Sequence, residues 1–76
     1  MGSRNVLVVG SGGREYALCL ALERSSSVAS VIVAPGSAGM STRWKCYDIK
    51  TIEHTALLSL VEREKIDLVV SGPEAP

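Results

Sequence analysis

Phenylalanine is absent from this chain of 76 residues, and aromatic residues make up only 4% of it. Tyr16, Trp44 and Tyr47 are too few and too scattered to form the stacking platform on which single-stranded nucleic acids bind. An excess of one charge is also missing, because 8 basic residues balance 8 acidic ones. Nucleic acids and anionic membranes both select clustered positive charge. We therefore expect no nucleic-acid partner and no membrane partner.

Cysteine is scarce as well. The chain has 2 cysteines, Cys19 and Cys46, without the C-x-x-C spacing of metal and redox sites. Cys19 lies in an apolar run, where a free thiol packs as a small hydrophobe. No apolar stretch approaches the roughly 20 residues that span a bilayer, and the N-terminus lacks the features of a secretory signal. We expect structural thiols in a reducing, cytoplasmic compartment.

Apolar residues, in contrast, make up 46% of the chain, and they come in short runs. Residues 5–9, 28–34 and 68–70 are rich in valine and isoleucine without alternation, which favours strands buried on both faces of a parallel sheet. Residues 40–50 show a weak pattern, for which we expect a loop with a short edge strand near residues 45–49. The order β-α-β-loop-α-β predicts an incomplete Rossmann-like α/β domain with a parallel sheet and right-handed crossovers.

Two segments show the periodicity of a helix. The first covers residues 14–24. The second follows Thr51, a residue type that favours the N-cap position, and its opposite face is polar, as solvent requires. The expected apolar stripes are Ala17, Leu18, Ala21 and Leu22 in the first helix, and Ala56, Leu57, Leu60 and Val61 in the second.

Three glycine-bearing loops, residues 10–15, 35–39 and 71–74, follow the expected strands. Because the carboxyl ends of parallel strands meet at one edge of a sheet, these loops could line one crevice. Glycines let the backbone approach a ligand, and the N–H groups at a helix start attract anions. We expect a phosphate or carboxylate near Gly12 and Gly13. The alternative is that the glycines serve only tight turns.

Two familiar nucleotide motifs are excluded by single residues. The dinucleotide pattern G-x-G-x-x-G requires a third glycine where Glu15 stands, and an acidic residue near Ala34 and Pro35. The phosphate loop G-x-x-x-x-G-K-[ST] fails because no lysine follows a glycine. Arg14 opposes the helix dipole at its position, so recognition of a phosphate or carboxylate explains it better than solvent exposure.

Residues 6–15 read VLVVGSGGRE, residues 33–39 read VAPGSAG, and residues 66–76 read IDLVVSGPEAP. In their order and spacing, these blocks resemble the opening of glycinamide ribonucleotide synthetases, also called phosphoribosylamine–glycine ligases. The resemblance implies that residues 1–76 are part of the N-terminal domain that precedes an ATP-grasp domain, which is absent here. In that family, ATP activates glycine as an acyl phosphate. The amine of 5-phosphoribosylamine then attacks it, giving glycinamide ribonucleotide, ADP and phosphate in purine biosynthesis.

The resemblance also implies residue roles. Gly12, Gly13 and Arg14 would contribute to the substrate's phosphate pocket, while Glu15 and Glu74 would accept hydrogen bonds from ribose hydroxyls or the amine. The other loop positions expected at the site are Gly36, Gly72 and Pro73. The parent enzyme would use ATP with Mg²⁺ or Mn²⁺, bound by the absent domain. We expect no catalytic residue and no cofactor in residues 1–76 alone, and the rest of the same polypeptide as a partner.

Two positions depart from the family: Tyr16 stands where histidine is usual, and Ser37 where asparagine is frequent. His54 lacks a partner for base catalysis, so we expect it on the exposed first turn of the second helix. Two other functions stay open. One is a nucleotide- or dinucleotide-binding module of an oxidoreductase, disfavoured by Glu15. The other is a non-catalytic interaction module in which the glycines serve only turns.

Overall fold

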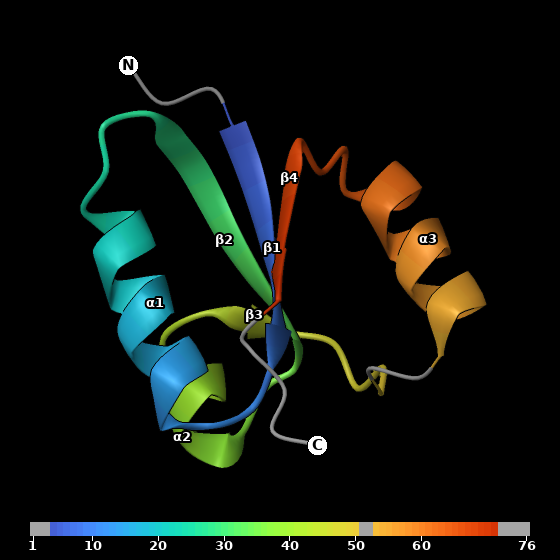
Figure 1. The fold of residues 1–76 in the computed structure, drawn as a ribbon, viewed down its shortest axis with the longest axis horizontal. Helices are drawn as coiled ribbons and strands as arrows, with labels where there is room; N and C mark the ends of the chain where they lie inside the picture. Colours follow the sequence, from blue (N-terminus) through green and yellow to red (C-terminus); the bar gives the residue numbers. More distant parts are fainter. Residues whose placement is uncertain (1–3, 51–52, 72–76) are drawn as a thin grey trace.

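The computed structural model describes residues 4–50 and 53–71. Its centre is a parallel four-stranded sheet with the strand order β3-β2-β1-β4 (Figure 1). Along the chain the elements are β1 (Arg4–Gly10), α1 (Gly13–Glu23), β2 (Val28–Pro35), α2 (Ala38–Ser41), β3 (Lys45–Cys46), α3 (His54–Arg63) and β4 (Leu68–Ser71). The α/β class and the parallel sheet expected from the sequence are confirmed.

The sheet carries helices on both faces, with α1 and α2 on one side and α3 on the other (Figure 1). Alternate residues of β1 therefore enter two different cores, which explains why its apolar run shows no alternation. The core on the α1 side contains Val6, Val8, Cys19, Val33, Met40 and Trp44. The core on the α3 side contains Leu7, Val9, Ile32, Ala34 and Leu60.

Asn5 joins the amino end of β1 to β2 and to the residues that lead from α3 into β4. Its Nδ2 donates to the backbone oxygen of Lys65 at 3.1 Å, and its backbone N–H donates to Asp67 Oδ2 at 2.8 Å. Its Oδ1 accepts a hydrogen bond from Ser30 Oγ at 2.9 Å. Lys65 has a φ of +54°, a left-handed turn that brings the chain from α3 into β4. Asn5 thus links the amino ends of β1 and β2 to the turn that precedes β4.

The segment expected to be a loop contains a short helix, α2. Ser37 caps it, because its Oγ accepts a hydrogen bond from the Met40 N–H at 3.3 Å. Met40 is fully buried in the core on the α1 side, and its burial stabilises α2. A helix of four residues is too short to be recognised from its sequence periodicity. The edge strand that follows is confirmed, although it spans only Lys45–Cys46.

The contact face of α1 differs from the expected stripe. Cys19 is fully buried, as expected for a small apolar thiol, while Leu18 and Leu22 are half-buried. Ala17 and Ala21 are exposed, so their assignment to the buried face is wrong. The helix meets the sheet along a face centred on Cys19, and this rotation turns the two alanines toward solvent.

The expectation that residues 68–70 form a fully buried strand is also wrong. Leu68 is 45% exposed and Val69 is 48% exposed. The reason is that β4 lies at the edge of the described sheet and pairs only with β1.

The N-cap of α3 is Glu53. Thr51, the expected N-cap, lies outside the described residues.

Candidate functional site

The glycine loop starts at the carboxyl end of β1 and leads into α1. Gly10 has a φ of +145°, a conformation that side chains rarely adopt. Gly12 is the N-cap, and its carbonyl accepts the Tyr16 N–H at 3.1 Å to form the first helical turn. The N–H groups of the first helical residues, Gly13 and Arg14 among them, have no acceptor within the helix. Such N–H groups at the positive end of a helix dipole are donors that suit an anion, and the anion expected near Gly12 and Gly13 stays a prediction.

Glu15 folds back onto this loop. Its Oε1 accepts the Gly12 N–H at 2.8 Å, and a Cβ built on Gly10 would lie only 2.4 Å from Glu15 Cγ. One carboxylate oxygen is therefore engaged by the loop itself, and the expected contact of Glu15 with ribose or amine stays a prediction. This carboxylate places a negative charge at the helix start. The neighbouring Arg14 is exposed and positively charged, and its expected contact with an anionic ligand stays a prediction.

Gly36 brings the second loop against the first. Its N–H donates to the Gly10 carbonyl at 3.1 Å. It has a φ of +74°, and a Cβ on it would lie 2.5 Å from Cys46 Sγ. Gly36 is thus closely packed between the end of β1 and the end of β3. Of the expected site residues, Gly12, Gly13, Arg14, Glu15 and Gly36 all lie at this edge of the sheet.

The third loop begins at the same edge, because Ser71, the last residue of β4, pairs in register with Val9 of β1. The three remaining expected site residues, Gly72, Pro73 and Glu74, lie outside the described residues, so their roles stay predictions.

The two cysteines are both free and differ in their surroundings. Burial, with smaller effects of Cys46, Glu23 and Glu15, raises the pKa of Cys19 to about 11. Burial also raises the pKa of the half-buried Cys46, against an opposing hydrogen bond from the Ser37 backbone.

Since the thiolate is the reactive form, a disulfide reagent at pH 8 should modify Cys46 first. The fast phase should vanish in Cys46→Ser and persist in Cys19→Ser; equal rates for both thiols would contradict this.

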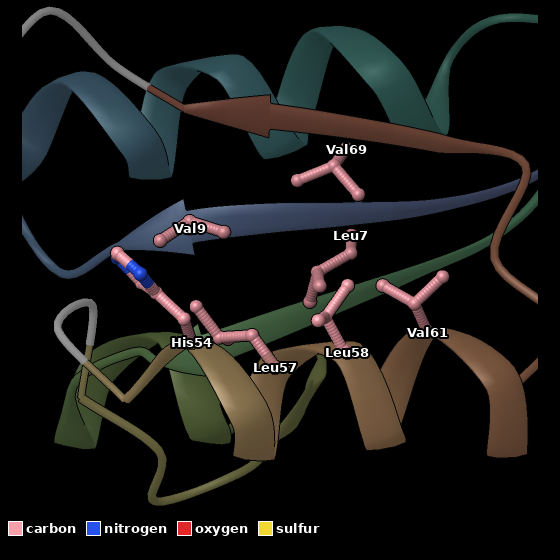
Figure 2. A pocket seen from close by; sticks show the side chains of 7 residues that line it. All are labelled: Leu7, Val9, His54, Leu57, Leu58, Val61 and Val69. Atoms are coloured by element: carbon pink, nitrogen blue, oxygen red, sulfur yellow. The ribbon is translucent and has the colours of Figure 1, made fainter.

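A separate cleft of about 270 Å³ lies between α3 and the sheet (Figure 2). Figure 2 shows the ring of His54 beside Val9 at one end of it. His54 is the exposed first residue of α3, as expected. Aliphatic side chains line the rest of the cleft, and these side chains offer no hydrogen bond to a phosphate. The other lining residues are Leu7, Leu57, Leu58, Val61 and Val69.

A family model described as "Phosphoribosylglycinamide synthetase, N domain" matches residues 4–76. The chain belongs to this family. Membership agrees with the parallel sheet and with the position of the glycine loop after the first strand.

Relatives of this phosphoribosylglycinamide synthetase N domain are ligases of purine biosynthesis. The phosphoribosylamine–glycine ligase of Xylella fastidiosa strain 9a5c is 47% identical over 73 residues, which are 93% of this chain and 17% of the relative. That of Rhodopirellula baltica is 42% identical over 76 residues, 100% of this chain and 17% of the relative. The human trifunctional purine biosynthetic protein adenosine-3 is 47% identical over 73 residues, 93% of this chain and 7% of the relative. The chain thus spans a small part of each.

The resemblance also implied ATP and a divalent metal. In residues 4–50 and 53–71, no group of three or more His, Cys, Asp or Glu side chains could hold a metal ion. This part of the N domain therefore offers no ligand set that fits the metal. Among the same residues, no helix is long and apolar enough to cross a membrane.

Some residues that shape the site were not singled out from the sequence. Gly10 had a visible signal, since it is the first glycine after a strand. Cys46 lies beside Gly36 only because β3 pairs with β2. Glu23 and Trp44 form a hydrogen bond across 21 positions, and no local pattern predicts such a pair.

Proposed function

We propose that this N domain supplies the phosphate and ribose side of the phosphoribosylamine site in an ATP-dependent carbon–nitrogen ligase. The parent enzyme would join 5-phosphoribosylamine to glycine in the cytoplasm, forming glycinamide ribonucleotide. One observation carries the proposal. The N–H groups at the start of α1 lie beside Arg14, and Gly36 from the next loop is held against Gly10 at the same edge.

Each group at this edge has a chemical task in the proposed site. The backbone N–H groups of Gly13 and Arg14 suit the oxygens of a 5-phosphate. The guanidinium of Arg14 adds charge-assisted hydrogen bonds to them. Oε2 of Glu15 can accept a ribose hydroxyl, because Oε1 is held by Gly12. The closely approaching backbone at Gly36 shapes the side of the pocket.

The proposed contribution of this chain to catalysis is binding and orientation. In the reaction, the substrate amine attacks the acyl carbon of activated glycine, and the bond from that carbon to the phosphate oxygen breaks. ATP supplies the activation, and its binding residues are expected elsewhere in the longer polypeptide. Fixing the ribose phosphate would place the amine for attack, which by itself can account for a large share of a rate enhancement. Residues 1–76 alone should be inactive.

A titration followed by NMR tests the proposal. Isotope-labelled chain with a dispersed spectrum is titrated with glycinamide ribonucleotide, and separately with NAD. We expect the ribonucleotide to shift the amides of Gly12, Gly13 and Gly36, while the amides of α3 stay in place. Shifts with NAD alone would favour the dinucleotide-binding alternative, which Glu15 disfavours. No shift with either compound would favour glycines that serve only turns.

Replacing Arg14 should separate binding from stability. Arg14→Gln should weaken the binding of glycinamide ribonucleotide by about 10- to 100-fold, as expected for loss of a charge-assisted contact. Because the exposed side chain opposes the helix dipole, the free energy of unfolding should change by no more than about 0.5 kcal/mol. Arg24→Gln, at the other end of the same helix, is the matched control. Equal losses of affinity in both variants would point to a general charge effect.

A further inference from the structure

A cluster of polar and aromatic side chains joins α1 to the segment that follows α2. Trp44 is 8% exposed, and its Nε1–H donates to Glu23 Oε1 at 2.7 Å. Arg43 donates to Glu23 Oε2 at 3.2 Å, and its guanidinium lies 5.5 Å from the centre of the Trp44 ring. The ring of Tyr16 meets that of Trp44 edge to face, with centroids 5.1 Å apart and planes at 75°. We call these four residues the Trp44 cluster.

The two aromatic members of the cluster each follow one of the two described site loops. Tyr16 lies in the first turn of α1, directly behind the glycine loop. Trp44 follows α2, and its backbone N–H donates to the Met40 carbonyl at 2.9 Å. Met40 is fully buried, which fixes α2 and the loop before it to the core. The cluster therefore connects, through α1 and α2, the same two loops that the Gly36 N–H and the Gly10 carbonyl connect at the sheet.

The contacts within the cluster are unequal in strength. The Arg43–Glu23 ion pair has side chains that are 45% and 38% exposed, and solvent-exposed pairs contribute little. The indole N–H of Trp44 is partly buried and donates to a charged acceptor, which makes it the stronger contact. Its ring also fills space against Tyr16. We therefore expect the replacement of Trp44 to weaken the cluster more than the replacement of Arg43.

We propose that Trp44 is a positioning residue for the phosphoribosylamine site. Held by Glu23 and packed on Tyr16, it fixes the loop that contains Gly36 against the glycine loop. Tyr16 acts here through ring packing, which gives it a task different from hydrogen bonding to the substrate. The identity of the ligand rests on the function proposed above, whereas the geometry of the loops does not.

Hydrogen exchange without ligand tests the geometry. Trp44→Phe keeps an aromatic ring beside Tyr16 and removes the N–H that Glu23 accepts. We expect the Gly36 amide to exchange at least about tenfold faster relative to the Val8 amide in the centre of β1, since local opening frees it. Leu57→Ala, in α3 on the opposite face, should leave this ratio unchanged. A Gly36 rate that rises only in step with Val8 would overturn the proposal, because Trp44 would then serve general stability alone.

Affinity for glycinamide ribonucleotide gives the second measurement. Trp44→Phe and Glu23→Ala should each weaken binding by about tenfold, the size expected for losing a hydrogen bond to a charged group. Glu23→Gln keeps an acceptor oxygen and should restore most of the affinity. Unchanged affinity in Trp44→Phe would overturn the positioning role. If the unaltered chain binds no ribonucleotide, the proposed function fails, and the Gly36 exchange ratio still decides whether Trp44 holds the loops.

Discussion

Gly10→Ala is expected to destabilise the fold by roughly 2–4 kcal/mol, the sum of a strained backbone and a lost helix cap. The φ of +145° at this position is unfavourable for alanine. The new Cβ would also lie 2.4 Å from Glu15 Cγ, so the Glu15 side chain would have to leave the Gly12 N–H. The substitution therefore strains the backbone of the loop and also removes the hydrogen bond between Glu15 and Gly12. It should also lose binding of glycinamide ribonucleotide.

Urea unfolding, followed by circular dichroism, measures this effect. Gly39→Ala is the matched control, because a Cβ on Gly39 meets nothing within 4 Å and the residue lies in α2. It should be neutral or slightly stabilising, since alanine favours a helix more than glycine does. A Gly10→Ala variant as stable as Gly39→Ala would show that the loop does not hold the conformation described.

Leu60→Ala is expected to cost about 2–5 kcal/mol, the usual range for emptying a buried leucine site. Leu60 is fully buried and is the α3 residue at the centre of the core beneath β1 and β2. Small domains have stabilities of roughly 0.05–0.15 kcal/mol per residue. For 76 residues this is about 4–11 kcal/mol, so a loss of this size would remove a large share of the stability.

Leu58→Ala provides the comparison, because it makes the same change two positions away on the same helix. Leu58 is 66% exposed, so its removal should shift the free energy of unfolding by about 0.5 kcal/mol or less. Thermal unfolding of both variants, monitored by circular dichroism, measures the difference. Equal effects would mean that α3 does not pack on the sheet through Leu60.

The parts of the fold that the sequence predicted are those specified by local pattern. The run from Val6 to Val9 indicated a strand buried on both faces, and β1 has helices over both faces. The glycines that follow it indicated a strand-to-helix loop, and the structure places Gly12 at the helix N-cap. Glycine conformation and β-branched packing are short-range properties, so single residues reveal them.

The parts that could not be predicted depend on distant neighbours. The short helix α2 exists because Met40 reaches the core, and Trp44 is explained by Glu23, far from it in sequence. The run from Leu68 to Val70 is as apolar as a buried strand, yet its exposure is set by its position at the sheet edge. The hydrogen bond from the Gly12 N–H to Glu15 likewise could not be predicted, because it depends on the backbone geometry at Gly10.

The strand order predicts the sequence of events during folding. β1 lies between β2, which follows it after one helix, and β4, which joins it through contacts such as Asn5 to Asp67 across 62 positions. The local unit of β1, α1 and β2 can pair early, while β4 must close a long loop, and such non-local pairings are slow. Until β4 arrives, one edge of β1 is unpaired. Two newly made chains could pair at that edge, so the slow docking of β4 lengthens the time during which the nascent protein is exposed to aggregation.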